Sequence, residues 1–121
     1  MPKCLVLYSE MPTKYLSSEE PEIVLAMQGM WLSSMCFISN YVPISNSSST
    51  PRENFLIRKS SIKDIDNIVG YLHTHEPHLP NPSPADLEGL PECHIGVVWC
   101  DGKLSWYSRN NEIEVVLAIP K

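Results

Sequence analysis

The chain has 121 residues, of which 43% are hydrophobic and 19% charged, and its formal net charge is −5. This composition is that of a globular protein, and the length suffices for one hydrophobic core but not for two. The acidic balance, without a cluster of Lys or Arg, argues against a nucleic-acid partner, and no apolar run is long enough for a membrane span or a signal peptide. We expect one cytoplasmic domain over residues 1–121 that binds neither nucleic acid nor a membrane.

The first half of the sequence predicts mostly strands. Apolar, β-branched stretches place them at residues 3–8, 22–32, 35–44 and 55–57. The second and third of these strands meet at Ser33-Ser34, which predicts a β-hairpin. A short helix is expected to end within residues 17–20. Another begins at Ser60 or Ser61, which supply an N-cap, and ends near Asp66.

The second half predicts a buried strand over residues 67–72 that runs into His73 and His75. Because side chains alternate along a strand, these two imidazoles are expected to point the same way. Ser83-Pro84 has the pattern of a helix start, with Ser as the N-cap and Pro at the first helical position. The last three strands are expected at residues 95–99, 103–107 and 112–119, joined as a meander with a hairpin turn at Asp101-Gly102.

The residues around this predicted strand end carry metal chemistry. His73 and His75 can hold one ion together, and Asp86, in the first turn of a helix from Pro84, can return as a third, anionic ligand. Three protein ligands leave a fourth position for water, which distinguishes catalytic from structural zinc. Cysteines 4, 36, 93 and 100 form no C-x-x-C pair, so we expect reduced, mostly buried thiols and not a second metal site.

The same stretch resembles the signature of the JAMM, or MPN-plus, zinc metallopeptidases. That signature is His-Ser/Thr-His, seven residues, Ser, two residues, Asp, and it fits His73, Thr74, His75, Ser83 and Asp86 without a gap. The resemblance implies an α/β fold in which a central mixed, largely antiparallel sheet with a cytidine-deaminase-like core is flanked by a few short helices. It also implies a catalytic glutamate upstream of the histidines.

Glu22 is the candidate for that glutamate. Pro21-Glu22 stands at the head of an apolar strand and is followed by Gly29 at the spacing that the family shows. Many relatives carry Cys-Gly two and three residues after the glutamate, where this chain has Val24 and Leu25. Three other carboxylates remain alternatives for the base, namely Glu19, Glu20 and Glu53.

The resemblance implies a zinc-dependent peptidase or isopeptidase. One Zn²⁺ per chain would be held by His73, His75 and Asp86, and it would lower the pKa of a bound water to about 7. Glu22 would take the proton of that water and pass it to the departing amine. Ser83 would donate a hydrogen bond to the developing oxyanion. The scissile bond would be an amide or isopeptide in a protein tail.

The substrate is less defined than the reaction. Members of the family cleave ubiquitin or ubiquitin-like conjugates, process sulfur-carrier proteins or act in phage tail assembly. The compact length favours a prokaryotic or viral enzyme, which would act in the host cytoplasm if the gene belongs to a phage. Two alternatives remain: a non-catalytic MPN-type scaffold in a larger complex, and a DNA-repair-associated branch that shares the ligand spacing.

Overall fold

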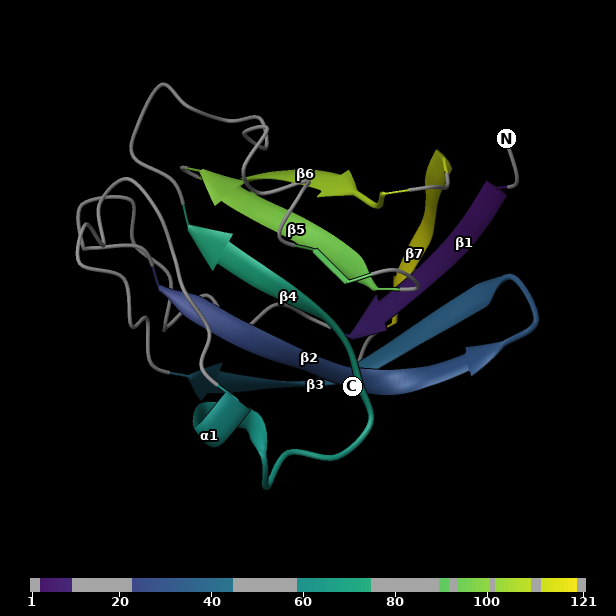
Figure 1. The fold of residues 1–121 in the computed structure, drawn as a ribbon. Helices are drawn as coiled ribbons and strands as arrows, with labels where there is room; N and C mark the ends of the chain where they lie inside the picture. Colours follow the sequence, from purple (N-terminus) through teal and green to yellow (C-terminus); the bar gives the residue numbers. More distant parts are fainter. Residues whose placement is uncertain are drawn as a thin grey trace.

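The computed structural model describes residues 3–9, 23–44, 59–74, 90–91, 94–100, 102–109 and 112–119. Its strands are β1 (Lys3–Ser9), β2 (Val24–Leu32), β3 (Met35–Ile44), β4 (Ile68–Thr74), β5 (Ile95–Cys100), β6 (Lys103–Tyr107) and β7 (Glu112–Ile119) (Figure 1). Within these ranges the one helix is α1 (Lys59–Ile62), a single turn. No helix in the described part of the chain is long and apolar enough to cross a membrane.

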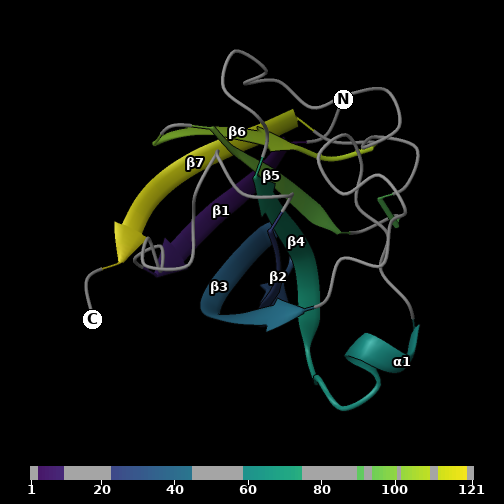
Figure 2. The same ribbon diagram turned by 90° about the vertical axis from the view of Figure 1, so that its left-hand side faces the viewer.

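All seven strands belong to one mixed sheet in the order β6-β5-β4-β2-β3-β1-β7. The sheet curls strongly, so that strands from its two ends approach each other (Figures 1 and 2). Tyr8 of β1 and Trp106 of β6 touch across this approach, with ring centroids 5.0 Å apart. The sheet therefore forms a half-barrel that wraps around its own side chains.

This arrangement corrects the predicted fold class. The expected central sheet flanked by helices is wrong, because the described chain is nearly all strand, curled into a half-barrel. The physical reason lies in the curl: a flat sheet needs helices on both faces, whereas a curled one covers its inner face with its own strands. The predicted helix ending at residues 17–20, the strand at 55–57 and the helix starting at Pro84 fall outside the described residues.

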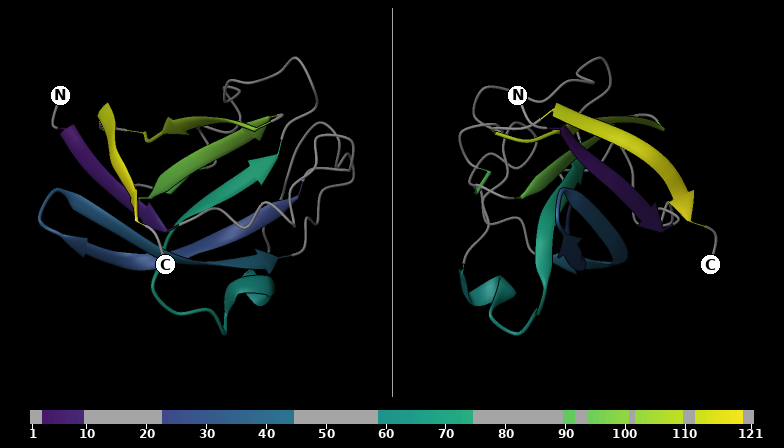
Figure 3. Two further views of the ribbon diagram at one scale, coloured as in Figure 1. Left: turned by 180° about the vertical axis from the view of Figure 1, so that it is seen from behind. Right: turned by 90° about the vertical axis from the view of Figure 1, so that its right-hand side faces the viewer.

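Two clusters of buried side chains lie on the two faces of the sheet. Because side chains alternate along each strand, Leu25 and Met27 of β2 join the larger cluster, which Leu72 and Val97 extend across β4 and β5. Ala26, between them in sequence, belongs to the second cluster. That cluster consists of Ala26, Tyr71, Leu90, Val98 and Tyr107, with partly buried neighbours that include Ile62 and Ile65 from and just after α1. The short helix thus covers part of the outer face (Figure 3).

The strand predictions can be checked individually. The β2–β3 hairpin is confirmed, with Leu32 opposite Met35 across the turn at Ser33-Ser34. The terminal meander is wrong, because β7 does not continue from β6 and instead pairs in parallel with β1. The curl explains the difference: it brings β1 close to β6, so that a short connection from β6 reaches the far end of the sheet. The helix expected to end near Asp66 ends at Ile62.

Candidate functional site

Of the five residues predicted to form the site, the structure describes one, His73. Its strand β4 runs from Ile68 to Thr74, two residues beyond the predicted end, and therefore includes this histidine. The other four, namely Glu22, His75, Ser83 and Asp86, lie outside the described residues, as do the alternative bases Glu19, Glu20 and Glu53. What the structure describes of the site, besides His73, is the pair of strand ends next to Glu22 and His75.

Those strand ends are neighbours in the sheet. β2 and β4 pair antiparallel with Val24 opposite His73. Ile23, just before β2, continues this pairing with Thr74: the Ile23 N–H donates to Thr74 Oγ1 at 2.9 Å, and the Thr74 N–H donates to the Ile23 carbonyl oxygen at 3.0 Å. The start of β2 and the end of β4 are thus joined by two hydrogen bonds at the same end of the sheet.

His73 is completely buried on the outer face of the sheet. Its register partners are Val24 of β2 and Val98 of β5, both fully enclosed. The ring of Tyr107 approaches it edge-on, with centroids 6.5 Å apart. Tyr107 can lean over the sheet because its register partner is Gly96, where a Cβ atom would collide with the tyrosine ring. Burial among strand neighbours leaves the His73 imidazole little rotational freedom.

A second histidine, His94, lies just before β5. Its ring packs against Tyr71, with centroids 5.8 Å apart. Burial lowers the pKa of His94, so it is neutral at pH 7, and burial raises the pKa of Tyr71. The buried Nδ1 atom of His94 has no hydrogen-bond partner among the described residues.

The described thiols are buried, as expected. They are Cys4, Cys36 and Cys100, and Cys93 lies outside the described residues. Burial, with a smaller contribution from the neighbouring Cys4, raises the pKa of Cys36 to about 12. A thiol that holds its proton so firmly is neither a good metal ligand nor a good nucleophile. Among the described residues, no three His, Cys, Asp or Glu side chains come together as a metal site would require.

The sequence reasoning overlooked Thr74. It served only as the middle residue of the His-Thr-His stretch, yet its buried hydroxyl oxygen is the acceptor that ties Ile23 to β4. The sequence did offer a signal, because Thr74 stands between two candidate ligands and its side chain is therefore expected on the opposite face of the strand. A polar side chain that is buried there needs a hydrogen-bond partner. Tyr107 was overlooked as well, because nothing in sequence links it to His73.

Comparisons with solved structures give the fold. A protein from Desulfitobacterium hafniense, solved in solution, matches with a TM-score of 0.66 at 12% identity, over 93% of each chain. A JAB1/MPN domain protein from Archaeoglobus fulgidus matches with a TM-score of 0.53 at 13% identity, over 84% of each chain. No protein-family model matches the sequence, and no curated protein matches it either. The chain thus has an MPN-like fold at a sequence identity that shows the fold alone.

Proposed function

We propose that this protein is a zinc-dependent peptidase or isopeptidase that hydrolyses an amide bond in a protein tail. The observation that carries the proposal is the hydrogen-bonded pair of Ile23 and Thr74. Glu22 precedes Ile23 and His75 follows Thr74, and neighbouring Cα atoms are about 3.8 Å apart. Chain connectivity therefore keeps the Cα atoms of Glu22 and His75 each within about 3.8 Å of a Cα atom of this hydrogen-bonded pair, which adjoins His73.

The donor set also suits zinc. Two imidazole nitrogens and one carboxylate oxygen are ligands that zinc accepts in catalytic sites, where a fourth position stays open for water. His73 supplies one nitrogen from a buried strand position, and a rigid ligand of this kind loses little conformational entropy when an ion binds. His75 and Asp86 would complete the set. The MPN-like fold is the second support, because His73 and Thr74, the first two residues of the matching signature, end strand β4 of that fold.

Each remaining residue would then have one task. Once bound, zinc would supply a water whose pKa is lowered to about 7. The Glu22 carboxylate would accept a proton from that water as the water oxygen bonds to the carbonyl carbon, and it would return the proton to the amine nitrogen as the C–N bond breaks. The Ser83 hydroxyl donates a hydrogen bond to the carbonyl oxygen as negative charge develops on it. This proton transfer needs a carboxylate that lies beside a metal ligand but is not itself a ligand.

The test combines metal content with turnover on the full chain. After reconstitution with zinc, the wild type should hold about one zinc ion per chain, and Asp86→Asn should lose it. Glu22→Gln should keep the zinc but lower kcat on ubiquitin-like fusions with Gly-containing tails by about 10²–10⁴-fold. Ser83→Ala should keep the zinc and lower kcat by about 10²–10³-fold.

Matched variants separate the candidate bases. Glu19→Gln, Glu20→Gln and Glu53→Gln make the same change at the alternative carboxylates and should leave turnover as in the wild type. If one of these variants loses turnover and Glu22→Gln does not, the base is wrongly assigned. A folded, reconstituted wild type without zinc would overturn the proposal altogether and direct the search to a scaffold role.

A further inference from the structure

The β2–β3 hairpin presents part of a strand edge that no described strand covers. The pairing of β2 with β4 ends at Gln28 and Ile68, whereas β2 continues to Leu32. Just beyond that pair, the Gly29 N–H donates to the Asn67 carbonyl oxygen at 2.9 Å, where the chain turns into β4. From there to its tip, the hairpin extends past β4, as Figure 1 shows. We refer to residues 29–32 as the open β2 edge.

The hairpin register determines which backbone groups point to this edge. In an antiparallel ladder, successive residues direct their N–H and C=O groups to opposite sides. Gly29 directs its N–H away from β3, toward Asn67. Trp31, two residues further along an unshifted stretch of the same ladder, therefore directs its N–H and C=O the same way. One donor and one acceptor at a single residue can pair with the same groups of an identical chain about a two-fold axis.

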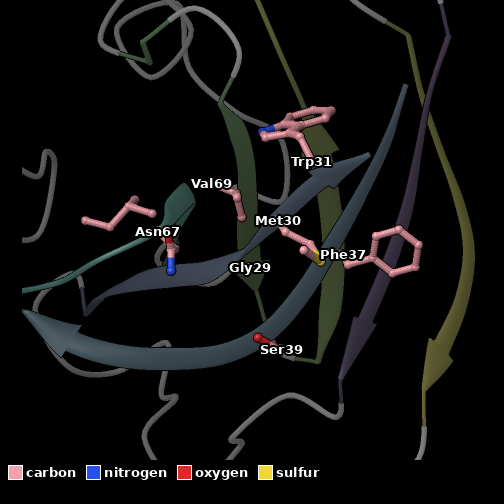
Figure 4. Close-up of a pocket in the computed structure, with 8 residues that line it drawn as sticks. Gly29, Met30, Trp31, Phe37, Ser39, Asn67 and Val69 are labelled. Atoms are coloured by element: carbon pink, nitrogen blue, oxygen red, sulfur yellow. The ribbon is translucent and has the colours of Figure 1, made fainter. Parts of the chain in front are cut away.

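The side chains that flank Trp31 are unusually exposed. Met30 is 62% and Leu32 59% exposed, and they are the two exposed large hydrophobic residues of the described chain. They are two residues apart on one strand, so they lie on the same face. Beside Met30 is a groove of about 520 Å³, shown in Figure 4. Its lining consists of Gly29, Met30, Trp31, Phe37, Ser39, Asn67, Ile68 and Val69.

Charge distinguishes this edge from the two ends of the sheet. Exposed strand edges are normally protected from pairing by charged residues, above all Lys. β6 begins with the exposed Lys103, and β7 carries Glu112 and Glu114. By contrast, residues 23–51 contain no Asp, Glu, Lys or Arg. Two copies of a chain with a net charge of −5 repel each other, and this neutral hairpin adds no charge to that repulsion where the copies would meet.

We propose that the open β2 edge is a dimer interface between two copies of this chain, with the two-fold axis at Trp31. Trp31 faces Trp31 of the second copy, and the two residues exchange a pair of N–H···O=C hydrogen bonds. Met30 of each copy then lies opposite Leu32 of the other as a non-hydrogen-bonded pair, with Cα atoms about 4.5 Å apart. The groove beside Met30 has room for the side chains that arrive from the second hairpin.

This surface is independent of the proposed hydrolytic site. The interface lies at the end of β2 that contains Leu32, whereas His73 pairs with Val24 at the other end. Five or more residues of strand separate the two, which at about 3.3 Å per residue is roughly 17 Å or more. Dimerisation can therefore be tested without reference to zinc or turnover.

The first test is sedimentation of the full chain over about 1 to 500 µM, because so small an interface is expected to dissociate at about 10–100 µM. Leu32→Lys places a charge at the interface from an exposed position, so it should fold normally and raise the dissociation constant at least about tenfold. Ser60→Lys adds the same charge on α1, at another exposed residue, and should leave the dissociation constant unchanged.

The second test examines the register. Met30→Cys and Leu32→Cys, mixed and mildly oxidised, should give a disulfide-linked heterodimer, because position 30 of one copy faces position 32 of the other and neither position faces itself. Either variant alone, and the wild type with its native cysteines, should give much less dimer. A wild type that is monomeric at 500 µM, or a dimer that Leu32→Lys does not weaken, overturns the proposal. So does a monomer that binds an extended peptide at this edge.

Discussion

Replacing Thr74 with Val tests the contact that joins β2 to β4 beside the candidate site. Thr74 is 1% exposed, and its Oγ1 accepts the Ile23 N–H at 2.9 Å. Valine has nearly the same shape, so the substitution removes the acceptor and leaves the packing in place. A buried N–H without a partner destabilises a protein by about 1–3 kcal/mol. We expect the free energy of unfolding of Thr74→Val to fall by about 2 kcal/mol.

Thr74→Ser is the matched control, because it keeps the hydroxyl and removes one buried methyl group, for which we expect about 0.8 kcal/mol. Urea unfolding gives both free energies, and amide exchange of Ile23 by NMR isolates the contact itself. Exchange at Ile23 should accelerate in Thr74→Val beyond the change in global stability, and should not in Thr74→Ser. Equal effects of the two variants on both measurements would refute the reasoning.

Three further predictions concern the core. Gly70→Ala should destabilise the fold by about 3 kcal/mol or more, measured by urea unfolding, because a Cβ there would collide with the Ile95 carbonyl oxygen. Tyr41→Phe should lower the free energy of unfolding by about 1–2 kcal/mol, since its hydroxyl donates at 3.0 Å to a buried carbonyl at the end of β1. The pKa of Cys36 is raised from 9.0 to about 12, so above pH 9 the unfolded chain releases a proton that the folded chain retains. Stability should therefore fall as pH rises from 9, and Cys36→Val should flatten this decline in urea midpoints.

Local patterns predicted the strands of the described chain but not their assembly. Apolar stretches separated by Ser33-Ser34 and Gly102 located the strands of both antiparallel hairpins, because turn residues and alternation act over a few positions. The parallel pairing of β1 with β7 joins residues more than a hundred positions apart. It depends on the curl of the whole sheet, and no local pattern in either strand encodes that curl. The wrong fold class and the wrong meander share this cause.

The candidate site shows the same division between local and distant signals. The apolar stretch at residues 67–72 predicted a strand that runs into His73, and His73 is on β4. The proximity of residue 22 to this strand end came only from the resemblance, and the pairing of Val24 with His73 supports it. The approach of Tyr107 depends on Gly96, which leaves space for the ring. Neither segment alone has a sequence pattern that predicts this packing of a large ring on one strand against a glycine on its neighbour.

His73 has two roles that experiments must separate, because it is fully buried as well as a proposed ligand. His73→Ala leaves a cavity, and we expect it to lower the free energy of unfolding by about 2–4 kcal/mol even in chelator, where no ligand role operates. A loss of zinc by His73→Ala would then not distinguish a missing ligand from a destabilised fold. His73→Gln preserves more volume, so it should destabilise the chelated protein less and still lose zinc. If His73→Gln binds zinc as the wild type does, the ligand role is wrong; if His73→Ala unfolds in chelator at the wild-type urea concentration, the packing role is wrong.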